Sequence, residues 1–203
     1  DTLYLEPGVY EGDLDFQIGK AGEDKIFLRG RGTGAVVIQG NLRIHQSANV
    51  VMERLNFGDE VKVDGSRDMA FENCRFGGSL EVANTQGLRV THCEFSNPRQ
   101  AAIRLAGSDG AFLGGNIYSN SEEAAVVADA ADSVFHSDYN SYGNREKSWR
   151  IGGEDWGFER LQKDHDRYSK ILLPEFTTEE GVARLRNTLP FAAAGPLGKP
   201  LGV

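Results

Sequence analysis

The chain has 203 residues, of which 39% are hydrophobic and 26% charged, a composition that is typical of a folded globular protein and excludes a disordered one. Its formal net charge of −8 excludes a nucleic-acid backbone as the main partner, because such a partner needs a basic face. The sequence contains no run of ~18 to 20 apolar residues, so it predicts no insertion into a membrane.

The N-terminal part carries short apolar runs that predict the strands of two irregular coils. These runs are 2–5, 14–16, 26–28 and 36–38. The sequence opens at Asp1 inside the first of them and without an initiator Met, so we expect an upstream segment to have been removed. The glycine-rich run Gly30–Gly34 lies between two strands with no helix after it, which predicts a turn and not a phosphate-binding loop.

The segment 42–95 contains a regular repeat that is made of three short strands. Its first strands are Leu42–Ile44, Val61–Val63 and Leu80–Val82, which recur at equal intervals, and an aromatic residue, Phe57, Phe76 or Phe95, ends each cycle. The second and third strands are predicted at 50–52 and 55–57, 69–71 and 74–76, and 88–90 and 93–95. A period near 20 built of short strands indicates a solenoid, and alternation places two residues of each strand inside.

Two longer cycles continue the pattern with a wider spacing. Ala101–Ile103 and Asp109–Phe112 match Ala124–Val126 and Asp132–Phe135 at one uniform offset. One cycle cannot bury its own apolar residues, so the cycles must stack as parallel strands ~4.8 Å apart. The absence of a helical period between the strands excludes a leucine-rich or other αβ solenoid. The sequence therefore predicts an all-β, parallel β-helix of about seven coils over residues 1–144.

The composition changes after Asn144, and residues 145–203 are predicted to form a C-terminal cap of the same domain. Ser148–Gly157 is predicted to be a loop that contains Trp and Gly, and Phe158–Tyr168 a short amphipathic helix. A cap is expected because the last coil of a solenoid would otherwise leave strand edges and apolar side chains uncovered.

Several motifs resemble right-handed parallel β-helix proteins of the pectate-lyase superfold, including the chondroitinase-B-like and alginate-lyase group. They are the opening Asp1–Tyr10, the repeated Glu72–Phe76 and His92–Phe95, the run Ser137–Tyr142, and the tail from Leu173–Phe176 to Gly195–Gly198. The resemblance implies a right-handed helix and a bacterial secreted protein, extracellular or periplasmic, that acts on polysaccharide. The chain has fewer coils than the enzymes of this group and lacks their long loops, so binding is the leading expectation.

The first strands of successive coils project an outward column of charged residues. In a lyase that acts on a uronate polymer, Lys62 or His45 would be the base, and Arg43 and Arg104 would clamp the carboxylate. The alternative is a solvated face with internal ion pairs, such as Lys62 beside Glu81.

Carbohydrate binding is the second role predicted for exposed residues. The candidates are Trp149, Trp156, Glu81 and Asp64. Exposed rings would stack on sugars, whereas packing of the cap on the last coil is the alternative for the two Trp residues and for Tyr142 and Tyr168.

Three hypotheses for function remain. The leading one is a secreted domain, a module of a larger protein with additional domains, that interacts with polysaccharide or another glycan along its lateral face. The second is a polysaccharide lyase or hydrolase, and the third is a noncatalytic scaffold or adhesion spacer.

The remaining polar and sulfur-containing residues are given structural roles. Cys74 and Cys93 should stack inside the cylinder as buried free thiols, with a disulfide as the alternative, and Arg75 and Glu94 should form an exposed cross-strand pair. The histidines lack metal-ligand spacing, so no metal or other cofactor is predicted. Calcium is the alternative, with oxygen ligands from Asp129, Asp132 and Asp138.

Overall fold

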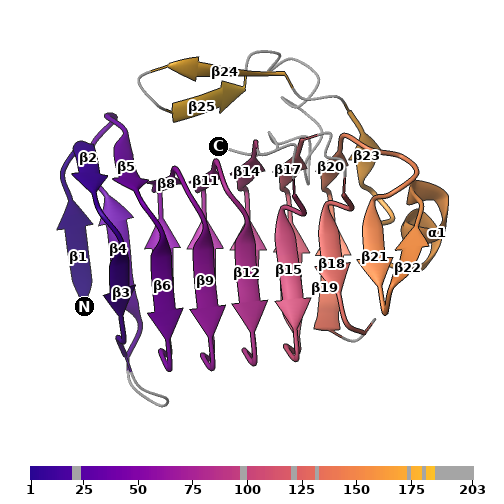
Figure 1. Cartoon of the computed structure of the whole chain (residues 1–203), viewed down its shortest axis with the longest axis horizontal. Helices are drawn as coiled ribbons and strands as arrows, with labels where there is room; N and C mark the ends of the chain where they lie inside the picture. The colour runs from indigo at the N-terminus through magenta and orange to yellow at the C-terminus, as the bar shows by residue number, and fades with distance from the viewer. Residues whose placement is uncertain are drawn as a thin grey trace.

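The computed structural model describes residues 1–19, 24–96, 100–119, 123–130, 133–172, 175–179 and 182–185. Three parallel sheets, which we call sheets A, B and C, stack along one axis and enclose a single core (Figure 1). The predicted all-β, parallel β-helix is confirmed. It has about six turns, because six turns separate the seven strands of sheet A.

Each sheet takes one strand from each coil, in chain order. Sheet A contains β1 (Thr2–Leu5), β4 (Ile26–Gly30), β7 (Val50–Glu53), β10 (Ala70–Glu72), β13 (Arg89–Thr91), β16 (Ala111–Gly114) and β19 (Val134–Asp138). Sheet B contains β2 (Gly8–Glu11), β5 (Val36–Gln39), β8 (Asn56–Phe57), β11 (Arg75–Phe76), β14 (Glu94–Phe95), β17 (Ile117–Tyr118), β20 (Ser141–Tyr142) and β23 (Lys170–Ile171).

Sheet C leads to the C-terminal elements. It contains β3 (Leu14–Phe16), β6 (Leu42–His45), β9 (Val61–Asp64), β12 (Leu80–Ala83), β15 (Ile103–Ala106), β18 (Val126–Ala128), β21 (Trp149–Ile151) and β22 (Glu154–Trp156). The helix α1 (Phe158–Asp164) follows, and β24 (Phe176–Glu179) pairs with β25 (Val182–Leu185) in an antiparallel hairpin.

The core follows from the alternation of side chains along the short strands. Leu42, Val61 and Leu80 lie in register on neighbouring strands of sheet C and are almost completely buried. Sheet B supplies a ladder of stacked rings, in which the centroids of Phe76 and Phe95 are 4.6 Å apart with an angle of 6° between the planes. Identical positions of successive coils thus bury identical kinds of side chain.

The turns between sheets C and A carry a ladder of hydroxyl groups. The backbone N–H of Ser47 donates to Ser66 Oγ (3.1 Å), that of Ser66 to Thr85 Oγ1 (3.3 Å), and that of Thr85 to Ser108 Oγ (3.2 Å). These four hydroxyl residues are buried, so their side chains satisfy backbone donors that water does not reach.

The stack continues past Asn144, and the loop predicted at Ser148–Gly157 is a β-hairpin. Its first strand, β21, pairs in parallel with β18, so that Trp149 lies opposite Val126. Trp149 and Ile151 fill the inward positions of another coil, and Gly152 has the positive φ of 56° that the tight turn needs. Trp149 follows Val126 at the same spacing by which Val126 follows Ile103, so β21 continues the wider spacing of the repeat. The sequence prediction missed this strand because it took the change of composition after Asn144 as the end of the stack.

The uniform offset predicted between the last two cycles is confirmed for β15 and β18, where Ile103 pairs with Val126, but it fails between β16 and β19. Ala111 pairs with Val134 at that offset, but a register shift then pairs Phe112 with His136 and Gly114 with Asp138. A bulge that inserts one residue moves every later side chain of the strand to the other face. His136 therefore joins the outward side of sheet A.

The cysteine prediction is confirmed, and the prediction for Arg75 and Glu94 is confirmed in part. Cys74 and Cys93 are free and buried. Arg75 Nε lies 3.1 Å from Glu94 Oε2, but Glu94 is buried and not exposed, because its side chain is only 2% accessible. In the part of the chain that the structure describes, no helix is long and apolar enough to cross a membrane.

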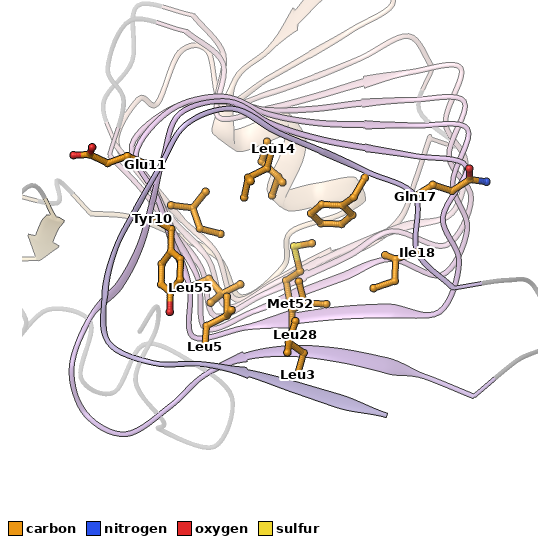
Figure 2. A pocket seen from close by; sticks show the side chains of 13 residues that line it. Leu3, Leu5, Tyr10, Glu11, Leu14, Gln17, Ile18, Leu28, Met52 and Leu55 are labelled. Carbon is orange, nitrogen blue, oxygen red and sulfur yellow. The ribbon is translucent and has the colours of Figure 1, made fainter.

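The two ends of the cylinder differ. At the C-terminal end, Phe158 and Leu161 of α1 are buried against the last coil, and the ring of Phe158 lies next to that of Tyr142. At the N-terminal end the first coil has no neighbour in the described chain, and its apolar residues surround an open cavity of about 540 Å³ (Figure 2).

Candidate functional site

The predicted column of charged residues is present on sheet C. Arg43, Lys62, Glu81 and Arg104 lie in register on four successive strands. Lys62 Nζ lies 2.8 Å from Glu60 Oε2 and 3.5 Å from Glu81 Oε2. The hydrogen bond with Glu60, together with the charges of Glu60 and Glu81, raises the pKa of Lys62 above its ordinary value. Lys62 is therefore held in the protonated form, whereas a general base must be unprotonated.

The other candidates on this face also contact neighbouring coils. His45 Nε2 lies 3.2 Å from Asp15 Oδ1, Asp64 Oδ1 accepts a hydrogen bond of 3.0 Å from Asn84 Nδ2, and Arg104 forms an ion pair with Glu123. The structure thus brings the predicted residues onto one face but engages His45, Lys62, Asp64 and Arg104 in pairs with residues of neighbouring coils. Such pairs are typical of an exposed sheet surface.

The two Trp residues are in the core and not on the surface. Trp149 is 0% and Trp156 9% exposed. Trp149 Nε1 donates to Tyr142 Oη (2.9 Å) and its ring stacks on His165, while the Arg160 guanidinium lies 3.8 Å from the centroid of the Trp156 ring. Their ring faces are therefore occupied by packing of the cap.

A second lateral site lies on sheet A. A cleft of about 380 Å³, which we call the sheet A cleft, extends across strands β10 to β19. One wall is the outward row of Arg89, Phe112 and His136, and the other is the row of turn residues that includes His92 and Tyr139. The cleft crosses four coils, so it follows the axis of the solenoid.

The first wall is a stack of planar groups. The Arg89 guanidinium carbon lies 4.8 Å from the centroid of the Phe112 ring, and the rings of Phe112 and His136 stack at 5.0 Å with an angle of 23°. Glu72 Oε1 lies 3.9 Å from Arg89 Nε. Cation–π and stacking contacts hold these groups in fixed positions next to the open space.

Two consecutive glycines form the floor of the cleft. A Cβ atom on Gly115 would lie 2.9 Å from His92 Nδ1, and one on Gly114 would lie 3.0 Å from Phe112 Cε1. Gly115 also has a positive φ of 70°, which a larger residue adopts only at a cost. Glycine at these positions leaves room for both side chains in the cleft.

The C-terminal rim of the cleft carries a pair of tyrosines. Tyr139 and Tyr168 stack at 5.2 Å with an angle of 17°, and Tyr168 is 52% exposed. Asp138 Oδ1 accepts hydrogen bonds from the backbone N–H groups of Tyr139 (2.8 Å) and Tyr168 (2.7 Å). One buried carboxylate thus anchors the backbone of both residues, and Tyr168 presents the exposed ring of the pair.

The residues named for calcium have other contacts. Asp129 Oδ2 accepts a hydrogen bond from the backbone N–H of Gly107 (3.0 Å). Asp138 Oδ1 accepts the two hydrogen bonds from the backbone of the tyrosine pair. Asp132 lies outside the described residues. Among the described residues, no group of three or more His, Cys, Asp or Glu side chains is arranged to hold a metal ion.

Sequence reasoning missed the sheet A cleft for an identifiable reason. Arg89, Phe112 and His136 occupy one coil position, but the bulge in β19 makes the step from Phe112 to His136 longer by one position than the step from Arg89 to Phe112. A search for aromatic residues at outward positions, with a single insertion allowed, would have found Phe112 and His136 together.

Fold and surface together define a parallel β-helix with a lateral cleft that is lined by aromatic and charged side chains. Comparisons with protein-family models, with curated proteins and with solved structures find no match to this chain.

Proposed function

We propose that this protein binds carbohydrate in the sheet A cleft. The observation that carries the proposal is the stacked pair of Tyr139 and the exposed Tyr168 beside a row of hydrogen-bonding groups. The C–H faces of a sugar ring pack on aromatic rings, while its hydroxyl groups need nearby donors and acceptors such as Arg89, His92 and Glu72.

The shape of the cleft supports a polymer as the ligand. Small-ligand sites have volumes of ~300 to 1,000 Å³, and the cleft, with about 380 Å³, is at the lower end of this range. The cleft would therefore hold only part of a longer ligand. The cleft crosses four coils along the axis, so a chain of sugars would lie along it and continue beyond both ends. The resemblance of the sequence to secreted β-helix proteins supports polysaccharide as the class and an extracellular or periplasmic location.

The lyase hypothesis places the ligand on sheet C instead. It requires an unprotonated base beside the arginines, and the raised pKa of Lys62 stands against that role. The scaffold hypothesis requires no ligand on either face. The same experiment separates the three.

The test is affinity electrophoresis in gels that contain neutral or uronate polysaccharides, with Tyr168→Ala and Phe112→Ala as variants. Arg43→Ala and Lys62→Ala on sheet C are the matched controls. We expect one class of polysaccharide to retard the protein, and each cleft variant to weaken the apparent affinity about tenfold, because each loses a stacking surface. The controls should bind like the wild type.

Two outcomes would contradict the proposal. Loss of binding only in the sheet C variants, with release of unsaturated products, would move the site to sheet C and favour the lyase. Equal migration in every gel would favour the scaffold.

A further inference from the structure

Asp138 lies at the C-terminal end of the sheet A cleft and uses only one of its two carboxylate oxygens within the described part of the chain. The residue is 8% exposed and lines the cleft. Its Oδ1 accepts the backbone N–H groups of Tyr139 and Tyr168, whereas its Oδ2 accepts no hydrogen bond from a described residue. Oδ2 is also not one of the enclosed side-chain atoms that lack a partner, so it is open to the cleft. Asp138 therefore presents an acceptor with unused lone pairs to a ligand.

Asp166 shows by contrast how this chain satisfies a carboxylate without a ligand. It is 0% exposed, and its two oxygens accept four hydrogen bonds from side chains of the last coil and the cap. A nearly buried carboxylate oxygen that lacks such donors has lost most of its hydration without compensation. The Oδ2 atom of Asp138 therefore requires a donor from outside the described chain.

The approach to this oxygen is open along the cleft. Asp138 is paired in sheet A with Gly114, which has no side chain that could cover it. On the other side stands Tyr168, whose ring is exposed and whose backbone N–H is bonded directly to Asp138. A sugar ring that packs beside Tyr168 thus also lies beside this carboxylate.

The fixed charge at this end of the cleft is negative. Asp138 forms no ion pair with a described residue, whereas Arg89, two coils away, has Glu72 Oε1 at 3.9 Å from its Nε. The Arg167 guanidinium carbon lies 5.7 Å from the centroid of the Tyr168 ring, but Arg167 is exposed. Water and salt screen an exposed charge much more than a buried one, so the charge of Asp138 dominates locally.

We propose that Asp138 is the specificity-determining residue of the sheet A cleft, an inference that rests on the carbohydrate binding proposed above. Its Oδ2 accepts a hydrogen bond from a hydroxyl group of the sugar ring beside Tyr168, and a bond of this kind to a carboxylate is stronger than one between neutral groups. A sugar that carries a carboxylate in place of that hydroxyl group loses the donor and meets a like charge. The C-terminal end of the cleft therefore selects neutral sugar units.

A matched pair of polymers tests this selection. For each neutral polysaccharide of the affinity gels, a second sample of the same polymer is oxidised at its primary hydroxyl groups to carboxylates. The gels are run at pH 8, because histidine as a residue type changes its charge between pH 5 and 8 and His92 and His136 line the cleft. We expect the wild type to bind the neutral form about tenfold more tightly than the oxidised form.

Two asparagine variants show whether Asp138 causes the preference. Asp138→Asn removes the charge but keeps a side-chain oxygen that can accept the two backbone N–H groups, so the preference should fall to within about twofold. Asp129→Asn is the matched control, because Asp129 also accepts a backbone N–H, that of Gly107, and does not line the cleft. It should keep the preference of the wild type. A purely structural role of Asp138 would change the affinity for both forms equally and leave their ratio unchanged.

Equal or tighter binding of the oxidised form by the wild type would overturn the proposal, and so would an unchanged ratio in Asp138→Asn. The comparison of the two polymer forms by the wild type needs no variant, so it decides the question even if Asp138→Asn does not fold. A wild type that binds neither form of any polymer would overturn carbohydrate binding itself and this inference with it, whereas binding without a preference would overturn this inference alone.

Discussion

Asp166 is the centre of a buried hydrogen-bond cluster under the C-terminal cap. Its Oδ1 accepts hydrogen bonds from Ser137 Oγ (2.8 Å), Asn140 Nδ2 (3.1 Å) and Ser169 Oγ (2.8 Å), and its Oδ2 accepts one from Tyr142 Oη (2.7 Å). The residue is 0% exposed. Burial raises the pKa of the Asp166 carboxyl above its ordinary value, and the four hydrogen bonds offset only part of that effect.

We predict that Asp166→Ala lowers the free energy of unfolding by about 3 kcal/mol, because four buried donors lose their acceptor. Urea denaturation followed by circular dichroism measures the loss. Asp164→Ala, an exposed position at the end of α1, is the control and should change stability by less than about 0.5 kcal/mol. Equal effects of the two variants would show that the cluster contributes little.

The raised pKa of Asp166 predicts the sign of a pH effect. A carboxyl that binds its proton more tightly in the folded state adds stability that is fully present below the ordinary pKa of 3.8 and is lost as the pH rises through the folded pKa. Asp166→Asn cannot titrate. As the pH falls from neutral towards 4, the urea midpoint of the wild type should therefore rise relative to that of the variant. A relative fall would mean that the hydrogen bonds, and not burial, dominate.

At the scale of elements, a ladder of stacked rings lies in register along the strands of sheet B. Phe95, Tyr118 and Tyr142 continue the stack, with centroid distances of 5.3 Å and 5.2 Å. The two tyrosines differ in their hydroxyl groups. Tyr142 Oη donates to Asp166 and accepts from Trp149, whereas Tyr118 Oη is buried without a hydrogen-bond partner among the described residues.

This difference predicts opposite results for the same substitution. Tyr118→Phe should leave stability unchanged or raise it by up to ~1 kcal/mol, because it removes an unpaired buried hydroxyl. Tyr142→Phe should lower stability by about 1.5 kcal/mol, because a hydrogen bond to a carboxylate is lost and Trp149 Nε1 loses its acceptor. Thermal denaturation of both variants measures the contrast, and a loss of similar size in Tyr118→Phe would indicate an additional partner for its hydroxyl.

The same elements show what the sequence could and could not predict. The inward columns were predictable, because an unbroken repeat places Leu42, Val61 and Leu80 at one position. The strand β21 was also predictable, because Trp149 follows Val126 at the spacing that separates Val126 from Ile103. The bulge in β19 was not, since it departs from the repeat. The sheet A cleft depends on that bulge, so its residues could be placed together only in three dimensions. The pairing of Lys62 with Glu81 was predictable from register alone.

At the scale of the whole molecule, the protein is a one-dimensional stack in which each coil packs only on its neighbours. Apart from β22 and the hairpin β24–β25, parallel pairing joins each described strand to the equivalent strands of the adjacent coils. Stability in such a stack is approximately a sum of contributions from single coils and from the interfaces between adjacent coils. A terminal coil has one interface where an internal coil has two.

Three leucines at the same inward position of sheet C make this argument measurable. Leu14 is 40% exposed, Leu42 2% and Leu80 0%. We expect Leu→Ala to cost about 3 kcal/mol at position 80 and at position 42, where a cavity remains, and at most about 1 kcal/mol at position 14. Hydrogen exchange should also show that Leu14→Ala accelerates exchange in β1–β3 and leaves β12–β16 unchanged, because the perturbed coil does not contact them. Similar costs at all three positions, or uniform acceleration along the stack, would mean that the coils unfold as one cooperative unit and that the first coil is packed as tightly as the middle ones.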